Sequence, residues 1–94
     1  MDFVIAADHP SLPGHFPGRP IVPGVVLLDR VYAAIEAAHG PLGATRLSQV
    51  KFLQPLLPGA SARVELEGQA PRWRFRVLRP DGGALASGEV AALA

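Results

Sequence analysis

The segment GHFPGRPIVPGVVLLD occupies positions 14–29 and joins a loop to a helix. The loop part is rich in Pro and Gly, which fix the turns of an ordered loop, and it carries His15. Pro23 has no N–H and therefore suits the first turn of the helix. The apolar run that follows ends at one acid, Asp29. A histidine in a stiff loop and a carboxylate on an apolar helix indicate an acid/base pair in an apolar pocket.

The helix predicted after Pro23 extends over residues 24–38. Its polar residues are few: Asp29, Arg30 and Glu36. A helix that is apolar on nearly all sides is buried, so we expect a sheet to wrap around this one. The tripeptide His39-Gly40-Pro41 predicts its end, because Gly tolerates a left-handed residue after a helix and Pro cannot continue one.

Strand-like segments precede and follow this helix in the sequence. They are residues 3–6, 45–54, 60–69, 72–79 and 84–92. Alternation is clearest in residues 72–77, where Trp73, Phe75 and Val77 face one way and three arginines the other. One strand, a buried helix and four more strands predict a single α+β domain over residues 1–94. In this domain one antiparallel sheet curls around one helix.

The order of residues in the 14–29 segment resembles a known signature. His15, Phe16, Gly18, Pro20, Pro23 and Gly24, then four apolar residues and Asp29, follow the pattern of the hotdog-fold 3-hydroxyacyl-acyl-carrier-protein dehydratases. The chain is most similar to the short dehydratase-like members of that family, since it begins later than the longer fatty-acid dehydratases. The resemblance implies a hotdog fold and the dehydration of 3-hydroxyacyl thioesters to trans-2-enoyl thioesters, in fatty acid or related lipid biosynthesis.

The resemblance also implies three catalytic roles. His15 removes the α-proton, the Gly24 N–H binds the thioester oxygen and a protonated Asp29 donates to the departing hydroxyl. The helix start supports the second role, because no Ser, Thr, Asp or Asn caps it and its first N–H groups are available. The neighbouring apolar residues are expected to contact the substrate: Phe16, Pro23, Val25 and Leu28.

Each of these residues also has a simpler interpretation. His15 is then a loop histidine bonded to a nearby carbonyl, and Pro23-Gly24 is only a turn. Asp29 is then exposed or paired with a strand arginine, since its neighbour Arg30 points elsewhere on a helix.

Other polar residues give weaker signals. Glu36 is either a second acid or the wet end of the helix, and His9 and His39 are more typical of structural or exposed histidines. The histidines lack the spacing of a metal site, so no metal is expected. Three arginines either dock the acidic carrier protein or form a solvated strand face: Arg72, Arg74 and Arg76.

Composition limits the remaining classes. The chain has 94 residues, 49% of them hydrophobic, which suggests that a second copy covers part of the surface in a homodimer or a multiple of dimers. A net charge of +1 without a basic run argues against nucleic acid. No cysteine, signal peptide or membrane span is visible, so a cytoplasmic location is expected.

The resemblance implies acyl carrier protein as partner, with coenzyme A thioesters as the other possibility, and no cofactor. Two rival functions stay open at this point. One is a hotdog acyl thioesterase, which uses a carboxylate to activate water and usually lacks the histidine-containing string. The other is a non-catalytic acyl-binding hotdog subunit.

Overall fold

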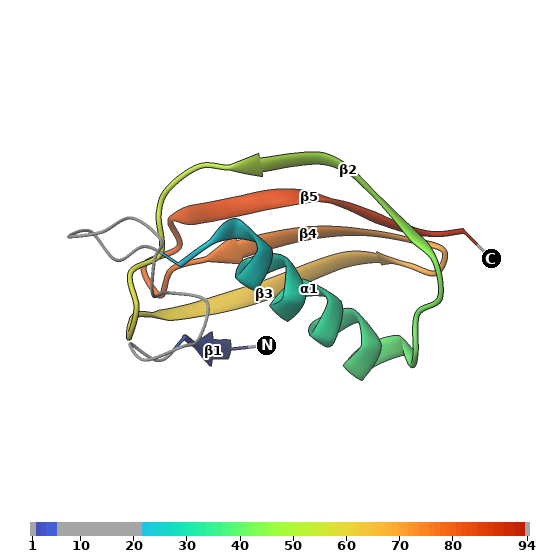
Figure 1. Cartoon of the computed structure of the whole chain (residues 1–94), viewed down its shortest axis with the longest axis horizontal. Helices are drawn as coiled ribbons and strands as arrows, with labels where there is room; N and C mark the ends of the chain where they lie inside the picture. Colours follow the sequence, from blue (N-terminus) through green and yellow to red (C-terminus); the bar gives the residue numbers. More distant parts are fainter. Residues whose placement is uncertain (1, 6–21, 94) are drawn as a thin grey trace.

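The computed structural model describes residues 2–5 and 22–93 and shows one helix packed across a five-stranded sheet (Figure 1). The elements are β1 (Asp2–Val4), α1 (Gly24–His39), β2 (Thr45–Phe52), β3 (Ser61–Gln69), β4 (Arg72–Leu78) and β5 (Ala84–Ala92). The strand order is β1-β3-β4-β5-β2, and all neighbours are antiparallel. This confirms the predicted α+β architecture.

β2 and β4 end slightly earlier than the sequence predicted, whereas β3 and β5 end at the predicted residues. β2 stops at Phe52 rather than at residue 54, because the N–H groups of Leu53 and Gln54 both turn to the Leu85 carbonyl oxygen, at 2.8 and 3.3 Å. β4 stops at Leu78 because the Arg79 N–H bonds across the turn to the Gly83 carbonyl at 2.8 Å.

The face of the sheet that meets α1 is apolar. Trp73, Phe75 and Val77 of β4 are buried on this face, as their alternation predicted. Phe75 lies opposite Gly88 of β5, and a Cβ at Gly88 would stand 2.7 Å from the Phe75 ring. The large ring therefore fills the space that the glycine leaves, and this pair closes the middle of the core.

α1 is buried on one side only. The residues that meet the sheet are Val26, Leu27, Val31, Ala34 and Ile35. The opposite side is exposed and carries Val25, Asp29, Ala33, Glu36 and Ala37. The prediction of a helix buried nearly all round is therefore wrong for the single chain, because the sheet lies against one side of the helix and leaves the other to solvent.

Strand β2 contains a bulge that decides which side chains face the helix. Ser48 pairs with Glu89 and Lys51 with Ser87, so β2 has one residue more than β5 between these pairs. Gln49 lies in this bulge with a φ of 54°. Because side chains alternate along a strand, the extra residue returns Phe52, which pairs with Ala86, to the same face as Leu47.

Candidate active site at the start of the helix

The start of α1 lies at one end of the molecule and is tied to the segment after β2 (Figure 1). The Val22 N–H donates to the Leu56 carbonyl at 2.9 Å, and Pro23 is extended, with φ −61° and ψ 145°. No side chain caps the helix. Within the described residues, no acceptor is bonded to the Gly24 N–H. This N–H is therefore available at the positive end of the helix dipole.

A small, mostly apolar cavity adjoins Gly24. Its volume is about 310 Å³, near the lower limit for small-molecule sites. Its lining residues are Val22, Pro23, Gly24, Leu27, Phe52, Leu53, Gln54, Pro55 and Leu56. Leu27 and Leu56 are buried and form fixed walls, whereas Phe52 and Leu53 are half-exposed. The cavity thus lies next to a backbone N–H that has no acceptor among the described residues.

Asp29 lies five residues further along α1, about 7.5 Å along the helix axis from Gly24. It is on the exposed side of the helix and makes no hydrogen bond or ion pair with the described residues. The expectation that Asp29 is desolvated is therefore not met in the single chain. The reason is that its own sheet covers the opposite side of the helix, so any cover must come from elsewhere.

The other predicted site residues separate into two groups. His15 and Phe16 lie outside the described residues. Pro23 lines the cavity with Gly24, but Val25 is 62% exposed and Leu28 packs partly against the core. Neither Val25 nor Leu28 lines the cavity. Leu27, which is buried and lies between them in the sequence, does.

Phe52 is a cavity residue that the sequence analysis did not select. A Cβ placed on Gly24 would stand 2.6 Å from the Phe52 Cζ atom, so the ring lies directly against this glycine. The signal was present in the broken alternation of β2, where Leu47 and Val50 are three positions apart and Val50 and Phe52 two. This pattern indicates a bulge that turns Phe52 toward the helix.

Glu36 and His39 belong to the far end of α1. The Glu36 side chain accepts a hydrogen bond from the Leu42 N–H at 3.3 Å, and the His39 ring meets Trp73 edge-on at 5.1 Å between centroids. Glu36 therefore marks the solvated end of the helix and is far along the chain from the cavity. His9 lies outside the described residues.

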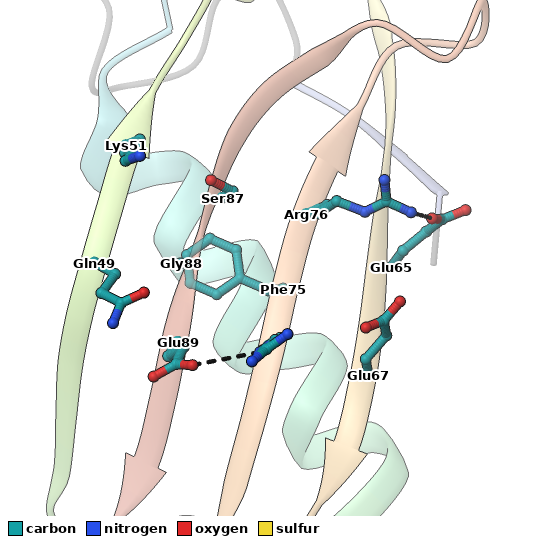
Figure 2. A pocket seen from close by; sticks show the side chains of 10 residues that line it. Gln49, Lys51, Glu65, Glu67, Phe75, Arg76, Ser87, Gly88 and Glu89 are labelled. Atoms are coloured by element: carbon teal, nitrogen blue, oxygen red, sulfur yellow. Dashed lines mark hydrogen bonds and ion pairs between the residues drawn. The ribbon is translucent and has the colours of Figure 1, made fainter.

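The sheet face opposite α1 carries a shallow hollow of about 550 Å³ that Arg74 and Arg76 of β4 line (Figure 2). Arg72 lines a smaller hollow of about 370 Å³, which shares Arg74 with the first. In this view the helix lies behind the sheet. Arg76 pairs with Glu65 at 3.0 Å and Arg74 with Glu89 at 3.4 Å. Positive and negative side chains alternate across this face, which favours the solvated-face interpretation. Docking of a carrier protein by Arg72, Arg74 and Arg76 stays a prediction.

Residues 2–5 and 22–93 contain no group of three His, Cys, Asp or Glu side chains arranged to hold a metal ion. Over the same part of the chain, α1 is too short and too interrupted by charge to cross a membrane as a helix.

Comparisons with known proteins place the chain among dehydratases. The model of the ApeI-like family, described as ApeI dehydratase, matches residues 1–89. The chain is 29% identical over 101 residues to the 3-hydroxyacyl-[acyl-carrier-protein] dehydratase FabZ of Rhizobium rhizogenes. The matched region covers 95% of this chain and 64% of that protein. It is 31% identical over 96 residues to FabZ of Haemophilus influenzae, with coverage of 93% and 64%. The chain therefore spans less than two thirds of the length of these relatives.

Solved structures show the same fold. The dehydratase heterocomplex ApeI:P from Xenorhabdus doucetiae contains a chain that matches with a TM-score of 0.81 at 21% identity, over 99% of this chain and 84% of that one. An uncharacterized protein from Erwinia carotovora subsp. atroseptica matches with a TM-score of 0.76 at 27% identity, over 98% and 81%. With its histidine string, its helix start and a family match over nearly its whole length, the chain belongs to the ApeI-like dehydratase family of hotdog proteins.

Proposed function

We propose that the chain dehydrates 3-hydroxyacyl thioesters to trans-2-enoyl thioesters. The observation that carries the proposal is the helix start. There the Gly24 N–H, which has no acceptor among the described residues, adjoins an apolar cavity, and in the sequence Gly24 lies between the His15 string and Asp29. The match to the dehydratase family model over residues 1–89 includes all of these residues.

The proposed reaction assigns one task to each group. His15 takes the proton from the α-carbon, and the Gly24 N–H donates a hydrogen bond to the thioester oxygen as negative charge develops there. The electron pair forms the double bond between C2 and C3 while the C3–O bond breaks. Asp29 supplies the proton with which the hydroxyl leaves as water. No metal or redox cofactor is needed in this scheme, because the thioester itself acidifies the α-carbon.

A second subunit completes the proposed site. Asp29 faces away from its own sheet, and in strand order β2 is an edge with no further described strand beyond it. We propose that two chains associate as a homodimer, so that each covers the other's exposed helix side and desolvates Asp29, which favours the protonated form that an acid needs. A heterodimer with a second hotdog subunit is the alternative, because the matching chain from Xenorhabdus doucetiae belongs to the dehydratase heterocomplex ApeI:P.

The substrate is proposed to arrive on acyl carrier protein. The FabZ relatives are named for 3-hydroxyacyl thioesters of that carrier. Coenzyme A thioesters share the pantetheine arm and are the other source. A cytoplasmic location goes with this substrate and stays a prediction.

The direct test is an assay of the purified chain with 3-hydroxyacyl thioesters on acyl carrier protein and on coenzyme A. Formation of the enoyl thioester is expected, and His15→Ala is expected to lower its rate at least about 10²-fold with little change in stability. Near-normal turnover by folded His15→Ala protein would exclude this mechanism. Release of free thiol instead of enoyl product would identify a thioesterase, and binding without turnover a non-catalytic subunit.

The shared site has a separate test. His15→Ala and Asp29→Ala homodimers each lack a complete site, whereas a mixed dimer has one intact site if each site takes one residue from each chain. Random mixing then restores roughly a quarter of the wild-type activity. If both residues act within one chain, mixing restores nothing. Differently tagged chains allow the mixed dimer to be isolated, and the isolated dimer should then show roughly half of the wild-type activity.

A further inference from the structure

Phe52 places a large, half-exposed ring directly on the glycine of the candidate active site. A Cβ on Gly24 would stand 2.6 Å from the Phe52 Cζ and 2.8 Å from its Cε1. The ring therefore takes the space where any other residue at position 24 would have its side chain. Phe52 is 54% exposed, although aromatic rings of its size are usually buried. The exposure of this apolar ring to water is unfavourable, which points to a function of Phe52 at the cavity.

The backbone fixes Phe52 at this place. Phe52 pairs with Ala86 of β5, and the next residue donates its N–H to the Leu85 carbonyl at 2.8 Å. The bulge at Gln49 turns the ring to the helix side, because an unbroken alternation from Leu47 would point it to the charged face.

We propose that Phe52 is a specificity-determining residue that excludes substrates with a branch at the α-carbon. This inference rests on the proposed function, in which the thioester oxygen sits about 3 Å from the Gly24 N–H. The α-carbon is two bonds from that oxygen, so a substituent on it lies close to the ring that touches the same glycine. Leu27 and Leu56 form buried walls of the cavity, whereas Phe52 is the lining side chain that lies directly against Gly24, so Phe52 bounds the space beside the α-carbon.

The test compares two pantetheine thioesters, 3-hydroxybutyryl and 2-methyl-3-hydroxybutyryl. The wild-type chain is expected to dehydrate the straight substrate with the higher kcat/KM. Phe52→Ala is expected to raise the ratio of branched to straight kcat/KM by about tenfold or more, the range that one methyl group gives in an apolar pocket. Leu57→Ala is the matched control, because Leu57 is 59% exposed and does not line the cavity, and it should leave the ratio unchanged.

A binding measurement separates this inference from the proposed function. Butyryl and 2-methylbutyryl pantetheine lack the 3-hydroxyl and cannot be dehydrated, so calorimetry reports their binding alone. If the wild type dehydrates the straight substrate but Phe52→Ala leaves the ratio unchanged, the role of Phe52 is refuted and the dehydratase function stands. If the wild type dehydrates nothing but binds the straight acyl group better, and Phe52→Ala removes that preference, the dehydratase function fails and the role of Phe52 stands. If the wild type dehydrates neither substrate and binds neither compound, both the dehydratase function and the role of Phe52 are refuted.

A folding control completes the experiment. Circular dichroism melting checks that Phe52→Ala is folded, and Phe52→Leu replaces it if it is not. The leucine is smaller than the ring and should raise the ratio in the same direction by a smaller factor. A ratio that does not change in either folded variant contradicts the proposal.

Discussion

The two ends of α1 are built in opposite ways. At the last turn, the Gly40 N–H donates to the Glu36 carbonyl at 2.8 Å, and the Glu36 carboxylate accepts the Leu42 N–H. Nearby, the hydroxyls of Tyr32 and Thr45 are 2.9 Å apart and join the helix to the start of β2. Hydrogen bonds within the chain thus close this end of the helix.

At the first turn the Val26 N–H donates to the Pro23 carbonyl at 3.0 Å, but the Gly24 N–H has no acceptor among the described residues. Pro23 provides no side-chain cap, a cavity adjoins Gly24, and Asp29 is exposed without a described partner. Leaving a helix start uncapped sacrifices stability of about 1 kcal/mol. The contrast indicates that the closed end holds the fold together while the open end is kept available for a ligand. Substitutions should therefore affect activity at the first turns and stability at the last.

Substitution of Asp29 is expected to give the largest difference between the two ends of α1. Asp29→Asn is expected to lower dehydration at least about 10²-fold, because the amide cannot donate the proton that the leaving hydroxyl needs. Its melting temperature should stay near that of the wild type, since the side chain is exposed. Glu36→Gln, on the same exposed side of the helix, is the matched control and should keep full activity. An active Asp29→Asn enzyme would remove the functional role of the open end.

At the closed end, Gly40→Ala should cost stability and leave activity unchanged. Gly40 has φ 109° and ψ −179°, a region that only glycine adopts readily, and nothing lies within 4 Å of a Cβ placed there. The substitution therefore strains the backbone, and the free energy of unfolding, measured in urea, is expected to fall by about 1–3 kcal/mol. Gly43→Ala is the control, because Gly43 has no positive φ and equally open space. Equal losses for both variants would contradict this explanation.

Tyr32→Phe tests the bond between the helix and β2. Removing the hydroxyl should lower the free energy of unfolding by about 1 kcal/mol, the usual value for a partly buried hydrogen bond. A double-mutant cycle with Thr45→Val isolates the pairwise energy. Additive effects of the two substitutions would show that the hydroxyls do not interact, and a fall in kcat would show that the two ends are coupled.

The turn between β4 and β5 provides a reference outside both ends and should give the smallest effect. The Gly83 N–H, 2.8 Å from the Asp81 carboxylate, and then Arg79 lower the pKa of Asp81 below its ordinary value of 3.8. A lowered folded pKa stabilises the protein above the ordinary pKa, and this contribution is lost as the pH falls through the folded pKa. The stability difference between wild type and Asp81→Asn should therefore be present at neutral pH and vanish in acid. Chemical unfolding from about pH 6 to about pH 2 measures it, and a constant difference would contradict the assignment.

Much of the fold followed from local patterns in the sequence. The apolar run after Pro23 predicted α1, His39-Gly40-Pro41 predicted its end, and alternation predicted the buried row of β4. These succeed because helix caps and strand alternation depend on residues a few positions apart. The motif of residues 14–29 likewise predicted the family, since it is contiguous in the chain.

Two features depended on how distant segments meet. The exposure of Asp29 reflects which side of α1 the sheet covers, and composition alone suggested cover on all sides. The contact between Phe52 and Gly24 joins residues 28 positions apart through the bulge in β2. The sequence by itself determined the elements, the family and the residues capable of chemistry, because these depend on residue type and short-range spacing. Only the tertiary structure decided which face of α1 is open and which ring lies on Gly24, because packing between elements sets both.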